Sequence, residues 1–303
     1  MGKTALIFPG QGAQKAGMGK DFYENSETAK KIFDQASEML GLDMAALCFE
    51  ANDKLDITEY TQAAMVTTSL AMLAVLRERG LKADVAAGLS LGEYCALAAA
   101  GAMSTEDAIK TVRQRGILME SAVPAGQGAM SAVLMLAAEK IEEVLAPMEG
   151  VSIANYNCPG QIVISGKAQA VAEAGVKLKE AGAKRVIPLN VRGPFHSALL
   201  AEAGEKLGEV LAPVELHDLQ MPYVTNVTAQ YVNDTADIKD LLVRQVSSSV
   251  RWQQSVEAML ADGVDTFIEI GPGKTLTGFV KKINRKATTV NIETWEDMEK
   301  YLC

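Results

Sequence analysis

The segment Gly88-Leu89-Ser90-Leu91-Gly92 is the feature that most constrains how this chain can fold. A short apolar run over 84–87 precedes it, and residues 93–100, which are rich in helix formers, follow it. That order predicts a buried strand, a tight turn and a helix, the geometry of a G-x-S-x-G nucleophile elbow. The turn would expose the serine beside the free N–H groups of the helix N-terminus. An ordinary glycine-rich turn can carry the same five letters, but with these flanks we interpret Ser90 as a nucleophile.

Length and composition indicate a folded globular chain. Its 303 residues, 49% hydrophobic and 22% charged, are enough for one large domain or two ordinary ones. No stretch approaches the roughly 18–20 apolar residues of a membrane span, so we expect no membrane partner. The N-terminus has one basic residue before a strand-like run, and we expect no signal peptide.

Charge and cysteine content narrow the partners and the compartment. The net charge of −9 argues against nucleic acid as a general partner. The cysteines are scattered and form no CxxC pair: Cys48, Cys95, Cys158 and Cys303. They favour free thiols in the cytoplasm over disulfides or a zinc site, so we expect no bound metal.

The order of strand-like and helix-like segments predicts an α/β fold. Outside the middle of the chain we expect strands at 5–8, 84–87, 223–226 and 266–270, and helices at 28–40, 62–79, 93–100, 105–120, 197–211, 238–245, 250–262 and 274–283. Alternating strands and helices imply a mostly parallel sheet with helices on both faces. We therefore expect a large α/β-hydrolase-like domain formed by residues 1–125 and 194–303.

The pattern of expected strands and helices changes in the middle of the chain. Strands are expected at 130–136, 151–156, 161–165 and 184–191, and helices at 138–148 and 168–181. Their order, βαββαβ, is that of the ferredoxin-like motif. We interpret residues 126–193 as a small ferredoxin-like subdomain inserted into the large one.

A serine needs a base to accept its proton, and histidine is the usual one. The chain has two histidines. His217 lies in an unremarkable polar stretch and is expected at the surface. His196 lies in a rigid turn at the junction of the two domains, so it is the better candidate, although it could instead cap the helix that follows.

One apparent nucleotide motif can be set aside. Gly273-Lys274-Thr275 resembles the end of a phosphate-binding P-loop, but the first glycine of G-x-x-x-x-G-K-T would fall at Ile268. The motif is broken, and we expect no ATP site.

Several short motifs in a fixed order then indicate a family. They are Phe8-Pro9-Gly10-Gln11-Gly12, the elbow with Glu93, Gln114-Arg115-Gly116, Asn157-Cys158-Pro159-Gly160-Gln161, Gly193-Pro194-Phe195-His196-Ser197, Gln245 and Gly271-Pro272-Gly273. Together they resemble the malonyl-CoA:acyl carrier protein transacylase family of fatty acid synthesis, over nearly the whole chain. The resemblance implies transfer of a malonyl group through a serine ester, without a cofactor.

The resemblance assigns roles to the residues that match the motifs. Ser90 would attack the thioester, and His196 would serve as base and then as acid. A carbonyl of Gln245 would hold the other ring nitrogen, so that a dyad replaces a triad. The N–H groups of Gln11 and Leu91 would form the oxyanion hole.

The resemblance also implies how the acyl group is bound. Arg115 would pair with the free malonyl carboxylate, a bidentate contact that suits a guanidinium. Phe195 matches a position where an aromatic accompanies malonyl rather than α-methylated malonyl groups, and Asn157 is expected to contact substrate. Leu89 is a departure, because the family usually has histidine there.

The implied partners are malonyl-CoA and acyl carrier protein, and we expect the chain to act as a monomer. Both proteins would be acidic, so docking would need a local basic surface. We expect it at five basic residues after the Gly-Pro-Gly turn: Lys274, Lys281, Lys282, Arg285 and Lys286. A solvated helix face would show the same pattern.

Three alternatives stay open from the sequence. An α/β-type serine hydrolase or thioesterase shares the elbow, although this chain lacks an HGGG-type loop. An acyltransferase of a polyketide pathway would use the same chemistry. A non-catalytic binder of carrier protein could also have kept the fold.

Overall fold

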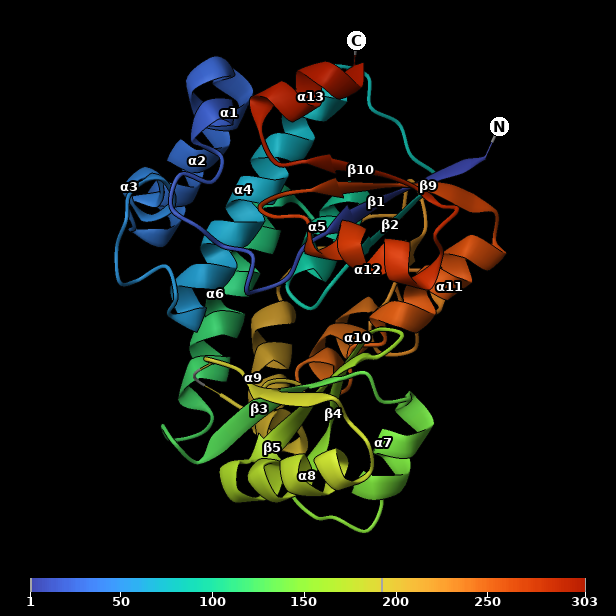
Figure 1. The fold of residues 1–303 in the computed structure, drawn as a ribbon. Helices are drawn as coiled ribbons and strands as arrows, with labels where there is room; N and C mark the ends of the chain where they lie inside the picture. The colour runs from blue at the N-terminus through green and yellow to red at the C-terminus, as the bar shows by residue number, and fades with distance from the viewer. Residues whose placement is uncertain (1, 192, 303) are drawn as a thin grey trace.

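The computed structural model describes residues 2–191 and 193–302, and it shows two units that each contain a sheet (Figure 1). The larger sheet has six strands in the order β10-β9-β1-β2-β7-β8. Its strands are β1 (Lys3–Phe8), β2 (Val85–Gly88), β7 (Tyr223–Val224), β8 (Tyr231–Val232), β9 (Val264–Ile270) and β10 (Thr288–Ile292). All neighbours pair in parallel except β8, which runs antiparallel to β7. The predicted parallel sheet is therefore confirmed, with one antiparallel edge strand.

From Ala5 to Phe8, strand β1 is buried on both faces, which explains the uninterrupted apolar sequence of these four residues. Leu6 and Phe8 pack into a core formed with α4 (Thr58–Glu78) and α5 (Gly92–Ala99). Ala5 and Ile7 pack into a second core, formed with helices α11 (Trp252–Ala261) and α12 (Thr275–Ile283). Side chains alternate across a strand, so one strand supplies both cores.

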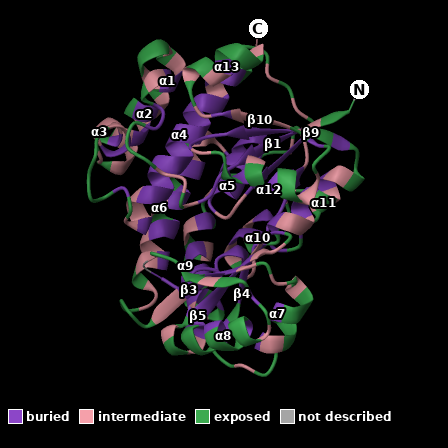
Figure 2. Cartoon of the chain, viewed as in Figure 1, coloured by how far each residue is buried: buried purple, intermediate pink, exposed green. Residues whose placement is uncertain are grey.

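Helix α4 is the central helix of the larger core, and nearly all of it is buried (Figure 2). The remaining helices of this unit are α1 (Lys20–Asn25), α2 (Glu27–Leu40), α3 (Met44–Phe49), α6 (Thr105–Ser121), α9 (Ala201–Leu211), α10 (Ile238–Gln245) and α13 (Trp295–Leu302), with a 3₁₀ turn at Ala198–Leu200. In the described part of the chain, none of the helices has the length and apolar character needed to cross a membrane.

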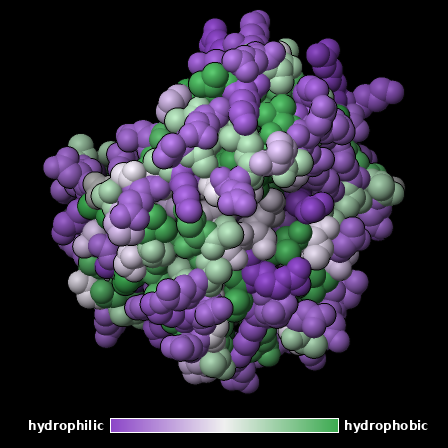
Figure 3. Space-filling view, turned by 90° about the horizontal axis from the view of Figure 1, so that it is seen from below, coloured by the Kyte–Doolittle hydropathy of each residue, from purple (hydrophilic) through white to green (hydrophobic). Residues whose placement is uncertain are grey.

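The small unit has a four-stranded antiparallel sheet in the order β4-β5-β3-β6. Its elements are β3 (Gly128–Leu134), α7 (Ala138–Leu145), β4 (Val151–Cys158), β5 (Gln161–Lys167), α8 (Ala168–Glu180) and β6 (Arg185–Pro188). Apolar residues of α7 and α8, such as Ile141 and Leu178, form a separate core with one face of the sheet. Seen from the end formed by this unit, hydrophilic side chains cover much of the surface (Figure 3).

Main-chain hydrogen bonds join the two units beside the site. The N–H of Tyr156 donates to the oxygen of Val250 at 2.9 Å, and the N–H of Val250 donates to Ala154 at 2.8 Å. Strand β4 is thereby fixed against the segment that leads into α11. The opposite face of the small sheet, away from α7 and α8, then faces the carboxyl ends of the large parallel strands.

Some element boundaries were predicted wrongly, and short elements were missed. The helix expected over 138–148 ends at Leu145, and the strand expected over 223–226 ends at Val224. Helices α1 and α3 and the C-terminal pair β10 and α13 were not expected. These elements have five to eight residues, too few to give a clear period, and β10 is an edge strand whose Thr288 and Asn291 weaken its apolar pattern.

Candidate active site

Ser90 lies in a sharp turn between β2 and α5, as an elbow requires. Its φ of 54° is in the left-handed region, which costs a non-glycine residue about 1–2 kcal/mol. The turn closes only because its flanking residues are glycines. A Cβ on Gly88 would lie 2.0 Å from the main chain of Gly92, and one on Gly92 would lie 2.3 Å from the oxygen of Phe8. The predicted strand, turn and helix are therefore all present.

His196 is within hydrogen-bond distance of the serine, and it is 4% exposed. Its Nε2 lies 2.7 Å from Ser90 Oγ, and its Nδ1 lies 2.9 Å from the main-chain oxygen of Gln245. A carbonyl can only accept, so Nδ1 must carry the proton and Nε2 is left free to take one from Ser90. Burial, and secondarily the positive charge of Arg115, lower the pKa of His196 to about 4, which keeps the imidazole neutral near pH 7.

Arg115 is a buried cation beside the nucleophile. It is 1% exposed, and its Nη2 lies 3.1 Å from Ser90 Oγ. Its other partners are neutral: Nη1 donates to Gln62 Oε1 at 2.7 Å, and Nη2 to Gln245 Oε1 at 3.0 Å. Its Nε–H is buried and has no acceptor among the described residues. This guanidinium therefore lacks a direct carboxylate partner within the described chain, an unusual state for a buried charge.

Gln245, at the end of α10, connects the base to the arginine. Its main-chain oxygen holds His196, and its side-chain oxygen accepts from Arg115. Its Nε2 donates to the main-chain oxygen of Ser90 at 3.0 Å and to Glu93 Oε2 at 2.7 Å. Glu93 is fully buried, and desolvation raises its pKa to about 7 although several hydrogen bonds oppose the shift.

The two main-chain N–H groups expected to form an oxyanion hole lie in adjacent loops beside the elbow. Leu91 immediately precedes the first turn of α5, and Gln11 lies in the loop after β1. Because β1 and β2 are adjacent and parallel, with Phe8 opposite Gly88, these two loops emerge side by side. Within the described chain neither N–H donates to a protein acceptor.

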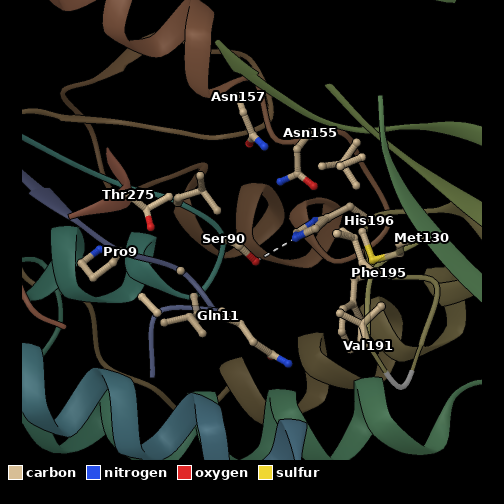
Figure 4. Close-up of a pocket in the computed structure, with 18 of the residues that line it drawn as sticks. Pro9, Gln11, Ser90, Met130, Asn155, Asn157, Val191, Phe195, His196 and Thr275 are labelled. Atoms are coloured by element: carbon tan, nitrogen blue, oxygen red, sulfur yellow. Dashed lines mark hydrogen bonds between the residues drawn. The ribbon is translucent and has the colours of Figure 1, made fainter. Parts of the chain in front are cut away.

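The side chains of Ser90, His196 and Arg115 and the loops that carry Gln11 and Leu91 line a cavity of about 450 Å³ between the two units. Ser90 and His196 lie in its centre, and the Gln11 side chain projects from one side (Figure 4). Asn155 and Asn157 of β4 project from the opposite side (Figure 4). The Oδ1 atom of Asn157 is buried and lacks a protein partner in the described chain, and Asn157 is one of the residues that line the cavity.

Two apolar side chains shape the cavity next to the dyad. Phe195 is 7% exposed and lines the wall beside His196 (Figure 4). Leu89 also lines the cavity and packs against the second core. It lies over Gly10, where an added Cβ would be 2.8 Å from Leu89 Cδ2.

The five basic residues expected to bind the carrier protein are all exposed; Lys274 immediately precedes α12, and the other four lie on it or just after it. Helix α12 also contributes Thr275, Leu276 and Phe279 to the cavity. Lys282 reaches across to Gln161 of the small unit at 3.1 Å, whereas Lys281 donates to the main-chain oxygen of Ala287 at 2.7 Å. The basic residues around α12 therefore border the cavity. Lys281 also hydrogen-bonds to the main chain just beyond the C-terminus of its own helix.

The other candidates from the sequence lie elsewhere. His217 is exposed and is not part of the cavity lining. Cys48, Cys95 and Cys158 are buried free thiols, and Cys303 lies outside the described residues. Among the described residues no cluster of His, Cys, Asp or Glu side chains could hold a metal ion.

Three buried residues of the site were missed by sequence reasoning. Gln62 on α4 supports Arg115, while Glu93 and Asn226 support the elbow. Gln62 and Glu93 are polar residues within otherwise buried helical stretches, and that pattern is a signal that could have been used. Asn226 gave no such signal because it follows a strand of only two residues.

A serine on an elbow and a neutral histidine within hydrogen-bond distance of it, at the carboxyl end of a parallel sheet, are typical of enzymes that transfer acyl groups. Comparison with known families agrees with this class. Residues 5–297 match the family described as "Acyl transferase domain", and the chain belongs to that family.

Individual relatives resemble the chain over its whole length. The malonyl CoA-acyl carrier protein transacylase of Bacillus subtilis (strain 168) is 49% identical, covering 99% of this chain and 96% of the relative. The crystal structure of MCAT from Streptococcus pneumoniae is 48% identical with a TM-score of 0.95, covering 99% of each chain. A malonyl-transacylase solved in complex with a type II PKS acyl-carrier protein is 39% identical with a TM-score of 0.96, covering 99% of each chain.

Proposed function

We propose that this protein transfers a malonyl group from malonyl-CoA to the phosphopantetheine thiol of acyl carrier protein by a ping-pong mechanism. Ser90 Oγ attacks the thioester carbonyl while His196 Nε2 takes its proton. The C–S bond breaks, and the same proton passes to the departing CoA sulfur. The acceptor thiol then gives its proton to His196 and attacks the malonyl-Ser90 ester, which returns Ser90 to its hydroxyl form.

The observation that carries this proposal is the unpaired charge of Arg115. This buried guanidinium lies 3.1 Å from Ser90 Oγ, and among the described residues its hydrogen-bond partners are all neutral and its Nε–H has no acceptor. An anionic acyl group would complement it. The free carboxylate of malonyl supplies the missing charge and forms bidentate hydrogen bonds. An acetyl group would leave the cation unpaired.

The other cavity residues take supporting roles. The N–H groups of Gln11 and Leu91 stabilise the tetrahedral oxyanion, where one donor typically contributes about 3–4 kcal/mol. Asn157 Oδ1 accepts from an amide N–H of the thioester arm. Phe195 fills the space where an α-methyl group would lie, which favours malonyl over methylmalonyl.

The carrier protein docks, in this proposal, on the exposed basic residues around α12. An acidic partner of an acidic chain needs such a local surface, and this one borders the cavity. The double variant Lys274→Glu/Lys282→Glu should raise the KM for carrier protein severalfold and leave that for malonyl-CoA unchanged. Lys179→Glu, on the exposed face of α8, is the matched control. An unchanged KM for carrier protein would reject this surface.

We also propose how the chain is divided into domains. Residues 126–193 form a ferredoxin-like subdomain, supported by the strand order β4-β5-β3-β6, and residues 1–125 and 194–303 form an α/β-hydrolase-like domain. The chain would act as a monomer in the cytoplasm and need no cofactor or metal. Size-exclusion chromatography with light scattering tests the first of these points.

Incubation with labelled malonyl-CoA tests the reaction itself. We expect one stable acyl group per chain, none on Ser90→Ala, and its transfer to added holo carrier protein. Prompt release of free malonate without an acceptor would instead indicate a hydrolase. Binding of carrier protein without any acylation would indicate a non-catalytic protein.

A further inference from the structure

The side chain of Asn226 hydrogen-bonds to the main chain of the elbow that carries Ser90. Strand β7 pairs with β2 only at Tyr223–Ala86 and Val224–Ala87, so the ladder ends before the elbow. Beyond that point the side-chain amide of Asn226, instead of a strand, makes the hydrogen bonds to the main chain that follows β2. Its Oδ1 accepts from the N–H of Ser90 at 2.6 Å, and its Nδ2 donates to the oxygen of Gly88 at 2.6 Å.

The orientation of this amide is fixed by its partners. One end of the amide faces the N–H of Ser90, which must donate, and the other faces the carbonyl of Gly88, which must accept. Only one placement of Oδ1 and Nδ2 satisfies both. The main chain of Asn226 is fixed as well: its N–H donates to Glu93 Oε2 at 3.1 Å, and its oxygen accepts from the N–H of Arg251 at 3.0 Å. Asn226 is 1% exposed, so water does not compete for these bonds.

We propose that Asn226 is a positioning residue for catalysis: its side-chain amide bridges Gly88 and Ser90 and holds the nucleophile in its left-handed conformation. The inference rests on the proposed acyl transfer through Ser90. Asn226 lies outside the cavity lining and acts on the reaction only through the elbow. Glu93 anchors the main chain of Asn226 and also binds Gln245, so the same network fixes the turn and the residue that holds His196.

If Asn226 acts only by positioning Ser90, its loss should lower kcat and leave KM nearly unchanged. Arg115 and the rest of the cavity are held by other contacts, so loss of the bridge should leave malonyl-CoA binding intact. The serine oxygen would lose its place relative to His196 and the oxyanion donors. Misplacement of a reacting group by about 1 Å can cost about 100-fold in rate.

The first test is the rate of acylation of Asn226→Ala by malonyl-CoA, measured per folded chain. We expect a fall of about 100-fold with KM within about twofold of wild type. Met298→Ala, in the buried face of α13, is the control for a general loss of stability and should keep the wild-type rate. A rate within threefold of wild type, or an equal loss in Met298→Ala, would overturn the proposal.

The second test uses Asn226→Asp, which keeps the size and shape of the side chain. It tests the positioning role even if Asn226→Ala does not fold. Ionised, the new carboxylate would face the carbonyl of Gly88 close to Glu93, and the positive charge of Arg115, which acts on Glu93, would offset only part of the repulsion. Protonated, it could donate to Gly88 and still accept from Ser90. The rate relative to wild type should therefore rise at least tenfold as the pH falls from 8 to 5.5, and a constant ratio would contradict the bridge.

Labelling of Ser90 with a fluorophosphonate separates this inference from the proposed function. The reagent needs an activated serine but neither malonyl nor carrier protein. Asn226→Ala should be labelled about 100-fold more slowly than wild type even if malonyl transfer itself were refuted. Equal labelling rates would overturn the positioning role alone.

Discussion

Arg115 donates from Nη2 to the side-chain oxygen of Gln245 at 3.0 Å. The main-chain oxygen of the same glutamine accepts from His196 at 2.9 Å. One residue thus orients both the arginine proposed to bind the acyl carboxylate and the histidine proposed as the base. The two groups are therefore positioned together, although Arg115 lies on α6 and His196 in a loop.

Replacement of Arg115 should change which acyl group is used. In Arg115→Ala we expect kcat/KM for malonyl-CoA to fall roughly 100-fold, because a charge-assisted bidentate pair contributes about 3 kcal/mol. Acetyl-CoA should lose far less, so that the malonyl preference shrinks. Parallel acylation assays with the two thioesters measure this.

Arg113, two residues earlier on the same helix, provides the matched control. It pairs with Glu59 at 3.1 Å and lies over the ring of Tyr60. Arg113→Ala should leave the malonyl preference unchanged. An equal loss for both thioesters in Arg115→Ala would contradict the assignment of Arg115 as carboxylate anchor.

The two functions of Gln245 can be separated because one uses the main chain. Gln245→Ala keeps the carbonyl that holds His196 and removes only the bonds to Arg115, Ser90 and Glu93. We expect a fall in kcat/KM of about ten- to a hundredfold. His196→Ala should be worse, since a general base contributes about 10²–10⁴-fold. Single-turnover kinetics compare the two, and equal losses would show that the side chain, too, is essential to the base.

A methyl group at Gly10 should disturb the proposed oxyanion site, where the loop that carries Gln11 contacts the elbow. The added Cβ would lie 2.7 Å from the main-chain oxygen of Leu89, so the loop that carries Gln11 must shift. We expect Gly10→Ala to acylate about 100-fold more slowly, comparable to loss of one oxyanion donor. Gly278→Ala, where a Cβ has open space, should behave as wild type. A fast Gly10→Ala enzyme would argue against Gln11 as a donor.

His196 and Glu93 should affect stability against pH in opposite directions. The pKa of His196 falls from an ordinary 6.5 to about 4 on folding, so between those values the unfolded chain binds more protons and stability rises with pH. The pKa of Glu93 rises from 4.5 to about 7, so between those values the folded chain binds more protons and stability falls as pH rises. In the wild type the two effects largely cancel between about pH 4.5 and 6.5.

Single substitutions should reveal each contribution. Urea unfolding from pH 4.5 to 7.5 should show Glu93→Gln gaining stability with rising pH up to about 6.5, where the histidine contribution ends. His196→Gln should lose stability up to about pH 7, where the Glu93 contribution ends. Parallel stability curves for the wild type and both variants would refute the two shifts.

Much of the architecture was predictable from local sequence. The apolar runs of β1 and β2 and the helical stretches between them predicted a parallel sheet covered on both faces, and the structure confirms it. The elbow around Ser90 was predictable too, because its glycines are required by contacts within a few residues. The β10 and α13 elements were not, because each is too short to show a period.

The sequence by itself determined the fold class, the sharp turn at Ser90 and, with only two histidines to choose from, the candidate base. Tertiary structure alone decided the state of Arg115 and the network behind Ser90. Arg115 and Gln245 are 130 residues apart, and Ser90 and Asn226 are 136 apart. His196 is held by a main-chain carbonyl, a group that every residue has and that no sequence pattern can single out. Such contacts exist only once the chain has folded.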